Sequence, residues 1–468
     1  MTRPARATRA AALALLSTLV LGGCASYRLL HDGQVNAKPA ERVKAKLVAV
    51  RGLTFRQPVP VEAVSAAEAR TMLERELHAQ YNTEELATLS RVYATLGLVP
   101  TGTDLEKAYL DLYSAQIAGF YDPIERRMVL VEDAVAPDFT TRILEGVLRR
   151  DFAGELVLAH ELTHALQDQY YGLDFGRNNL GEDDMQLARH AIYEGDATLA
   201  GFAAVLGQLS PSGAVSLARK LEGVPGAMAR AYPQIPAAVR ETVVFQYVAG
   251  VNFVSWAYQR AGWEGVNAVL AHPPVSTAQV LHPDKYFTHA EYPLSLHVSG
   301  VSPYVQDGWQ VVENATVGEF LIRVLGEQFL PGPRAQSVAA GWDGDRLLAL
   351  TKGDDVALVW QTAWDNEAEA AEFFDGYAAI LAAKHPGSAS SPAAVPASAT
   401  SAAPAADASV IASGGNAPYR LERRGAMVLA VEGPLDADLN RAAERVWRHS
   451  TSQRITPWVP IDLARATP

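Results

Sequence analysis

Apolar residues recur at helical spacing through the middle of this 468-residue chain. They return every three or four positions over 152–172 and again over 185–209, and Gly172 is placed to end the first of these segments. Capping-box patterns at Ser65 and Thr103 predict the starts of two further helices. The same spacing predicts helices at 213–222, 236–260 and 314–328. We therefore expect a mainly helical central region.

Strand-like patterns occur in two places. A short apolar run, Met128–Val131, follows the turn-forming pair Asp122–Pro123. After residue 335 a strand–strand–helix pattern occurs twice, the first time around a turn at 352–355. An Ala/Ser/Pro-rich insertion at 385–417 separates the two copies, and it lacks a core-forming pattern, so we expect it to be disordered. The predicted fold class is α+β, with a mainly helical domain at 51–335 and a small α+β accessory domain at 336–468.

The first 23 residues have the pattern of an export signal. Three arginines precede an apolar run, AALALLSTLVL, that is too short to span a bilayer as a stable helix. The run leads into Leu-Gly-Gly-Cys, which resembles a bacterial lipobox and implies cleavage before Cys24 and lipidation of its thiol. We expect 24–50 to be a lipid-anchored spacer. The alternative is an ordinary signal peptide followed by an incidental cysteine.

Charge and cysteine content fit this N-terminus. Cys24 is the only cysteine, so the exported chain would contain no internal disulfide. The net charge is −12, and removal of the three signal arginines would make it −15. So acidic a chain is a poor candidate for nucleic-acid binding, and no basic patch or glycine-rich phosphate loop argues otherwise. Residue Ala25, by resemblance to Gram-negative sorting rules, favours the outer membrane, with the protein facing the periplasm.

The first long helical segment carries His160-Glu-Leu-Thr-His164. Residues four apart lie on the same face of a helix, so both histidines can aim a ring nitrogen at one ion. Glu161 lies beside that face. Zinc prefers such ligands and lowers the pKa of bound water to about 7, so a nearby carboxylate can accept its proton. This spacing is the zincin signature and predicts one Zn²⁺ per chain. The alternative is an amphipathic helix that carries three polar residues by coincidence.

The second long helical segment offers a third ligand. It contains Tyr-Glu-Gly-Asp-Ala at 193–197, and Glu194 would complete a set of two histidines and one glutamate with a fourth position open. That is the arrangement of catalytic rather than structural zinc. His190, one turn earlier, is the rival ligand. The metzincin pattern is excluded, because the position six after His164 is Tyr170.

The sequence HELTHALQDQYYGL with a downstream EGDA resembles the gluzincin clan of metallopeptidases, the thermolysin-like group. The resemblance implies a zincin-like domain in which His160, His164 and Glu194 bind zinc and Glu161 is the general base. It extends more loosely over residues 50–290, where four further segments look like a group of poorly characterised bacterial gluzincin-like proteins. These segments are GLTFRQPVPVEAVS, AGFYDPIERRMVLVED, FQYVAGVNFV and PPVSTAQVLHPDKY.

Two features depart from the clan. Between His164 and Glu194 lie 29 residues, more than in thermolysin-like enzymes. The clan's aspartate that orients a metal-bound histidine lies four positions after the ligand glutamate, where this chain has Thr198. Asp196 or Asp168 could take that role, since a metal-bound histidine usually needs an orienting acceptor. The alternative for both is plain solvation or a contact at the helix end.

Peptide hydrolysis also needs a donor for the developing oxyanion. Thermolysin-like enzymes use a histidine and a tyrosine, and the resemblance makes His282 in the Pro-flanked segment LHPDK the first candidate. The alternative is an ordinary surface histidine. Further candidates are Tyr121, Tyr171 and Tyr286. The strand at 128–131 could bind substrate backbone as an added strand.

These features predict a zinc-dependent metallopeptidase that is anchored at the cell envelope and acts on peptides or envelope proteins. One alternative is a chaperone-like binding lipoprotein with a zinc site and little or no proteolysis. Another is a pseudoenzyme whose metal only joins two helices. Glu161 favours chemistry, because a purely structural site tends to be closed by a fourth protein ligand.

Overall fold

The computed structural model describes residues 28–132, 150–173, 183–386, 390–392, 407–412 and 418–454. The predicted signal peptide and Cys24 lie outside these residues. The chain divides into two compact units, each with helices and strands, which confirms a mixed α+β class. The first unit comprises Met1–Glu76, Tyr113–Asp174 and Asp196–Val215, and the second comprises Leu77–Leu112, Phe175–Gly195 and Ser216–Pro468. Among the described residues, no helix combines the length and apolar character needed to span a membrane.

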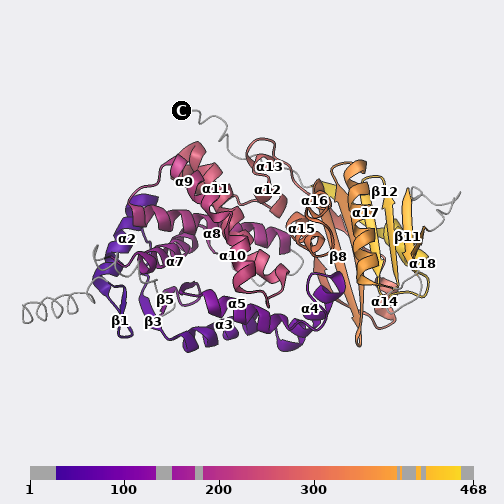
Figure 1. The fold of residues 1–468 in the computed structure, drawn as a ribbon, viewed down its shortest axis with the longest axis horizontal. Coiled ribbons are helices and arrows are strands. Elements are labelled where there is room, and N and C mark those ends of the chain that lie inside the picture. Colours follow the sequence, from indigo (N-terminus) through magenta and orange to yellow (C-terminus); the bar gives the residue numbers. More distant parts are fainter. Residues whose placement is uncertain are drawn as a thin grey trace, which may run out of the picture. The chain divides into compact units, whose positions relative to one another are not determined.

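The first unit packs a small sheet against the helix that carries the histidine motif (Figure 1). That helix is α7 (Phe152–Tyr171), and the sheet has the order β3-β5-β4. The strands are β3 (Val61–Val64), β4 (Gly119–Asp122) and β5 (Arg127–Val131). The predicted strand at 128–131 is therefore confirmed as β5, and its four apolar residues are all buried. β5 pairs with β3 in parallel and with β4 antiparallel.

The prediction that residues 24–50 form a spacer is wrong for the part that the structure describes. Leu29 is buried, and the helix α2 (Ala37–Arg51) packs against α7. The buried residues of α2 include a narrow apolar stripe of Ala40, Val43 and Leu47. The lysines and arginines between these positions hid the stripe in the sequence. The first unit therefore includes the segment that the sequence pattern assigned to a tether.

The predicted helix starts are partly confirmed. At Ser65, the backbone N–H donates to the Glu68 carboxylate (2.8 Å) and the hydroxyl oxygen accepts from the Glu68 N–H (3.3 Å), so α3 (Ala66–Gln80) opens with a capping box. The prediction at Thr103 is wrong by one residue. The helix α5 (Leu105–Gln116) is capped by Asp104, whose carboxylate accepts from Lys107 N, while the Thr103 hydroxyl donates to a turn carbonyl.

Two long helices meet at glycines in the second unit. The helix α8 (Asp183–Leu206) passes from the second unit into the first between Gly195 and Asp196. The helix α11 (Ala237–Ala271) has non-helical backbone angles at Ala261 and Gly262, which is where the predicted helix at 236–260 was expected to end. A Cβ on Gly250 of α11 would lie only 1.9 Å from the Ala191 carbonyl oxygen of α8. Glycine is therefore required where these two helices cross.

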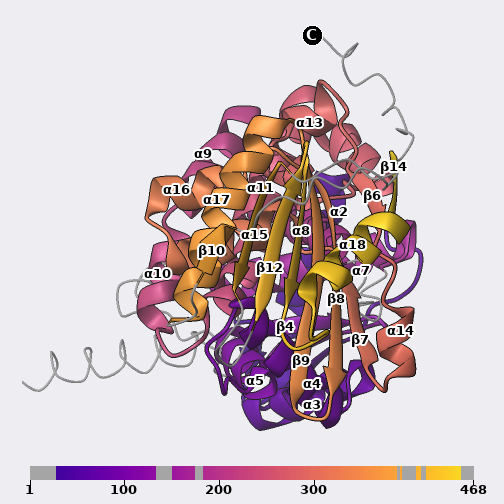
Figure 2. The same ribbon diagram turned by 90° about the vertical axis from the view of Figure 1, so that its right-hand side faces the viewer.

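A seven-stranded sheet forms the C-terminal part of the second unit (Figure 2). Its order is β10-β11-β12-β13-β9-β8-β7, and every neighbouring pair is antiparallel. The strands are β7 (Gln310–Ala315), β8 (Trp342–Lys352), β9 (Asp355–Trp364), β10 (Ser390–Pro392), β11 (Ala408–Ala412), β12 (Tyr419–Arg424) and β13 (Met427–Glu432). The two predicted strand–strand–helix copies are β8-β9-α17 and β12-β13-α18, with α17 (Glu367–Lys384) and α18 (Leu439–His449).

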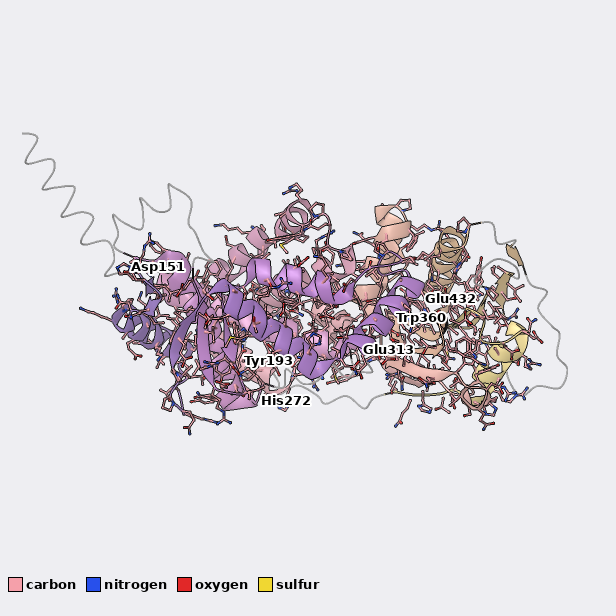
Figure 3. All side chains as sticks on the ribbon, turned by 90° about the horizontal axis from the view of Figure 1, so that it is seen from below. Asp151, Tyr193, His272, Glu313, Trp360 and Glu432 are labelled. Atoms are coloured by element: carbon pink, nitrogen blue, oxygen red, sulfur yellow. The ribbon has the colours of Figure 1, made fainter. Side chains whose placement is uncertain are left out.

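The two helices of these copies cover opposite faces of the sheet. The ring of Trp360 on β9 meets Tyr377 of α17 at 5.1 Å between centroids. Figure 3 labels Trp360 with Glu313 of β7 and Glu432 of β13. On the other face, Val446 of α18 packs in a buried cluster with Leu348 and Val359, and Figure 2 shows α18 in front of the strands.

The predicted disordered insertion at 385–417 is wrong in two places. Its residues 390–392 and 408–412 form β10 and β11, which extend the sheet beyond β12. Small Ala and Ser residues concealed the β-forming Val410–Ile411 pair. Residues 387–389, 393–406 and 413–417 lie outside the described part. The predicted helix at 314–328 is also shorter than expected, because 310–315 is β7 and α15 begins at Gly318 and ends at Phe329.

Candidate metal centre

The helix α7 is fixed at its first turn by charged partners. The Asp151 carboxylate caps the helix by accepting from Gly154 N (2.9 Å), and it also accepts from Leu29 N (3.0 Å). Glu155, one turn on, is buried and forms ion pairs with Lys46 (3.2 Å) and Arg150. The helix ends at Gly172, whose φ of 70° suits glycine. These contacts set the position of the motif that follows in the middle of α7.

The three motif residues converge within α7. One ligand atom from each of His160, Glu161 and His164 lies within 4.8 Å of the others, and this is the cluster of metal-binding type found among the described residues. The two Nε2 atoms lie 3.3 Å apart, and His160 Nε2 is 4.0 Å from Glu161 Oε1. The His160 and Glu161 side chains are 13% and 14% exposed, whereas His164 is 4% exposed. The predicted grouping of these three residues on one helix face is therefore present.

Hydrogen bonds determine which nitrogen of His164 faces the cluster. Gln167 Nε2 donates to Asp196 Oδ2 (2.9 Å), because a carboxylate can only accept. The other end of the same amide, Gln167 Oε1, must then accept from His164 Nδ1 (2.8 Å). His164 therefore carries its proton on Nδ1, and Nε2 presents a lone pair toward His160. This is the tautomer that a metal ligand of this geometry needs.

Behind Gln167 lies a fully buried ion pair. Asp196 is held by Arg51 of α2, with Nε–Oδ1 and Nη2–Oδ2 distances of 3.3 Å. Both side chains are at most 1% exposed. Arg51 thus holds Asp196, Asp196 holds Gln167, and Gln167 holds His164. Asp196 was predicted to contact and orient a histidine directly. In the structure it accepts from Gln167 instead, and Gln167 contacts His164.

The end of α8 packs against α7 in the first unit. A Cβ on Gly201 would lie 3.2 Å from Leu156 Cδ1 and 3.5 Å from His160 N. Further along, Arg150 Nη2 donates to the Val205 carbonyl (2.9 Å). Since Asp196 meets Gln167 and Val205 meets Arg150, the two helix segments run antiparallel.

Glu161 and Asp168 are both held by Tyr121 of β4. The Tyr121 backbone N–H donates to Glu161 Oε2 (3.1 Å), and its phenol donates to Asp168 Oδ2 (2.9 Å). Burial raises the pKa of Tyr121, and the hydrogen bond to Asp168 raises it further, so the phenol stays protonated. Asp168 was predicted to orient a histidine, but the acceptor on His164 Nδ1 is Gln167. Asp168 instead accepts from the hydroxyl of Tyr121, and the backbone N–H of the same tyrosine donates to Glu161.

The edge of the small sheet is not the strand that the sequence indicated. The strand at 128–131, predicted to receive substrate backbone, is the central strand β5. Within the described residues, β4 pairs only with β5 and is the edge. Val131 N donates to Ala118 O, so the alternating N–H groups at 118, 120 and 122 face β5, whereas that of Tyr121 points away from it. This outward N–H is the one that contacts Glu161.

The other predicted site residues belong to the second unit. Glu194 and His190 lie on the first part of α8. His282 ends the helix α12 (Thr277–Leu281), and its Nε2 lies 2.7 Å from Glu319 Oε1. This hydrogen bond raises the pKa of His282, and burial opposes the rise. His282 therefore forms an ion pair with Glu319 when protonated, and its predicted oxyanion role has no support from this contact.

The remaining tyrosines are divided between the units. Tyr171 is half-buried at the end of α7 in the first unit, and Tyr286 is buried in the second unit, where its hydroxyl donates to the His272 carbonyl. Sequence reasoning missed Gln167 and Arg51. Gln167 lies three residues after His164, which is a contacting distance on a helix, and this is the signal that could have identified it.

Comparisons with known proteins bear on the C-terminal part of the chain. A family model described as a domain of unknown function, DUF8575, matches residues 306–443. No curated protein and no solved structure matches the chain. The matched segment contains all seven strands of this sheet and extends to the beginning of α18. The chain is therefore similar to this family in its sheet region, which does not include the histidine motif.

Proposed function

We propose that this protein is a zinc-dependent metallopeptidase that is anchored at the cell envelope and hydrolyses peptide bonds. The observation that carries the proposal is the convergence of His160, Glu161 and His164, with two Nε2 atoms 3.3 Å apart. Two imidazole nitrogens at this separation can share a cation, and the Nδ1 proton of His164 is already committed to Gln167. Zinc held by such donors acidifies water and polarises a carbonyl oxygen.

Glu194 is the proposed third ligand. The resemblance of HELTHALQDQYYGL and the downstream EGDA to the gluzincin clan supports a donor set of two histidines and one glutamate. Such a set suits zinc with an open position.

Glu161 is the proposed general base. Its Oε2 accepts a hydrogen bond from Tyr121 N (3.1 Å), and its Oε1 lies 4.0 Å from His160 Nε2. One carboxylate oxygen is thus held by the edge strand while the other lies on the side of the histidine pair. In the proposed mechanism, Oε1 accepts the proton of the attacking water and later delivers it to the leaving amine. We expect β4, rather than β5, to align substrate backbone beside Glu161, because β4 is the edge strand.

The envelope location rests on the N-terminal sequence. The export signal and the lipobox-like segment at Cys24 support attachment through several acyl chains, which give lasting anchorage. The substrates would then be peptides or proteins of the envelope.

A glutamine at position 161 tests the mechanism. The soluble chain beginning at Ala25 should retain about one zinc per chain, and Glu161→Gln should keep that zinc. Turnover of an internally quenched peptide library should fall by at least about a hundredfold, because the general base is lost while the ligands remain. Glu84→Gln, an exposed glutamate on α4 (Thr83–Leu96), is the matched control. Equal turnover by wild type and Glu161→Gln would overturn the mechanism, and zinc binding without any turnover would favour the binding lipoprotein.

A further inference from the structure

A second candidate site lies on the C-terminal sheet, in the second unit. A pocket of about 210 Å³ opens on the face that α18 covers. Its walls come from β9, β12 and β13, from the end of α18, and from β14 (Thr451–Arg454). The lining residues are Gln361, Arg424, Met427, Trp447 and 450–452. Three of the seven lining residues, Gln361, Arg424 and Met427, lie in the segment that the family model matches.

Two of these lining residues each have one buried polar atom without a hydrogen-bond partner among the described residues. These atoms are Gln361 Oε1, an acceptor, and Arg424 Nε, a donor. The Gln361 residue is 2% exposed and the Arg424 side chain 5%. A buried polar atom without a partner is costly, so two such atoms on residues that line one pocket indicate a molecule that supplies both.

The charge of the wall selects a neutral molecule. Arg424 Nη2 already contacts Glu422 Oε2 (3.2 Å) and Glu444 Oε1 (2.6 Å). Glu422 also pairs with Arg420, so the two cations are matched by two carboxylates. Neither an anion nor a cation would gain a net electrostatic attraction here. What the wall offers is one acceptor, one donor and apolar surface.

A secondary amide fits this wall. Its N–H can donate to Gln361 Oε1, its carbonyl can accept from Arg424 Nε, and it carries no charge. Met427 and the indole of Trp447 supply the apolar surface for a neighbouring side chain. The indole is held in place, because Trp447 Nε1 donates to Glu422 Oε2 (2.8 Å) and Arg424 stacks on the ring.

The strand β14 points to a peptide as the source of that amide. All four of its residues are exposed, and within the described residues it pairs with β6 (Leu294–His297) alone. Its first residues, Thr451 and Ser452, form the rim of the pocket. An extended peptide could therefore place one amide in the pocket and continue along the rim, which a compact sugar could not do.

We propose that this pocket binds an extended peptide segment through one backbone amide, held between Gln361 and Arg424, with an apolar side chain against Trp447. The proposal is independent of the candidate metal centre, which lies in the first unit. It makes the C-terminal sheet a peptide-binding domain.

The experiment titrates N-acetyl-Ala-Leu-Ala-amide into the chain that begins at Ala25, with binding followed by calorimetry and ligand NMR. Glu161→Gln serves as the background, so the probe is not turned over. Gln361→Met should weaken binding by about tenfold or more, because the buried acceptor is lost. The same variant should unfold at an equal or higher temperature, since it removes a buried acceptor without a partner. Gln336→Met, an exposed glutamine on α16 (Gly332–Ser337), is the matched control.

A second variant keeps the proposal testable if Gln361→Met fails to fold. Ser452→Trp changes an exposed rim residue and should block the pocket while leaving its buried walls intact. N-acetylglucosamine, which carries the same amide on a sugar, is the comparison ligand. The proposal is overturned by an absence of saturable peptide binding, by equal binding in both pocket variants and the control, or by binding of the sugar alone. Loss of hydrolysis in Glu161→Gln has no bearing on these outcomes.

Discussion

The polar clusters of the two units are built in opposite ways. In the second unit, the buried Asp345 carboxylate accepts four hydrogen bonds, two from backbone N–H groups at the start of α15 and two from indole N–H groups. In the first unit, the Nε2 atoms of His160 and His164 face each other at 3.3 Å. Two neutral imidazoles can form one hydrogen bond at that contact, in which one nitrogen donates its proton to the other.

This difference separates a structural polar group from a functional one. A carboxylate whose oxygens are fully used stabilises the fold and offers nothing to a ligand. Two imidazole Nε2 atoms this close can both donate lone pairs to a shared cation once the proton between them leaves. The surrounding bonds through Gln167 and Tyr121 hold the first unit's cluster in that arrangement. Such a cluster adds little to folding until the cation binds.

The largest expected effect follows from removing both lone pairs. The double variant His160→Ala/His164→Ala should lower zinc affinity by at least about a thousandfold. In the presence of a chelator its free energy of unfolding should fall by only about 1–3 kcal/mol, because the buried His164 side chain and its bond to Gln167 are lost. Competition with a zinc-binding dye and urea unfolding measure the two quantities. Zinc binding at wild-type affinity by the double variant would show that the metal centre does not lie on α7.

The reverse pattern is expected at Asp345. Asp345→Ala leaves four donors buried without an acceptor, two of them at the first turn of α15. The free energy of unfolding should fall by about 3–5 kcal/mol. Zinc bound per folded chain should be unchanged. Asp345→Asn, which keeps one acceptor oxygen, should lose less, and equal losses in the two variants would show that the hydrogen bonds are not the cause.

Gln167 tests whether the metal centre depends on its supporting bonds. Gln167→Met keeps the length of the side chain but removes the acceptor on His164 Nδ1 and the donor to Asp196. Zinc affinity should fall by about 10–100-fold, as is typical when the partner of a metal-bound histidine is lost. Gln169→Met is the matched control, because Gln169 contacts Arg56 and Gln57. Equal zinc affinity in the two variants would show that Gln167 does not orient the histidine.

Sequence reasoning succeeded where the pattern is local. The spacing within α7 predicted both the helix and the convergence of His160 with His164, because one helix determines both. It failed where partners are distant along the chain. Arg51 is the last residue of a charged helix, the rest of which was interpreted as a spacer, and its partner Asp196 is 145 positions away. The edge position of β4 depends on the parallel pairing of β3 with β5, which no local pattern reveals.

The smallest effect concerns a carboxyl that is less well satisfied than Asp345. Asp184 of α8 is buried and accepts from Thr277 through a backbone N–H and a hydroxyl. Burial raises the pKa of Asp184 to about 8, the Thr277 bonds oppose the rise, and Asp345 and Glu319 add to it.

Between pH 4 and 8 the folded state therefore keeps a proton on Asp184 that the unfolded chain has lost, so stability falls as the pH rises through this range. In Asp184→Asn that fall should be smaller by about 1–3 kcal/mol between pH 5 and pH 8, measured by urea unfolding. The His282–Glu319 contact is present in both proteins, so the difference between their pH profiles isolates Asp184. Parallel pH profiles would mean that Asp184 is ionised in the fold, and the second unit would then hold a buried charge with only one residue to stabilise it.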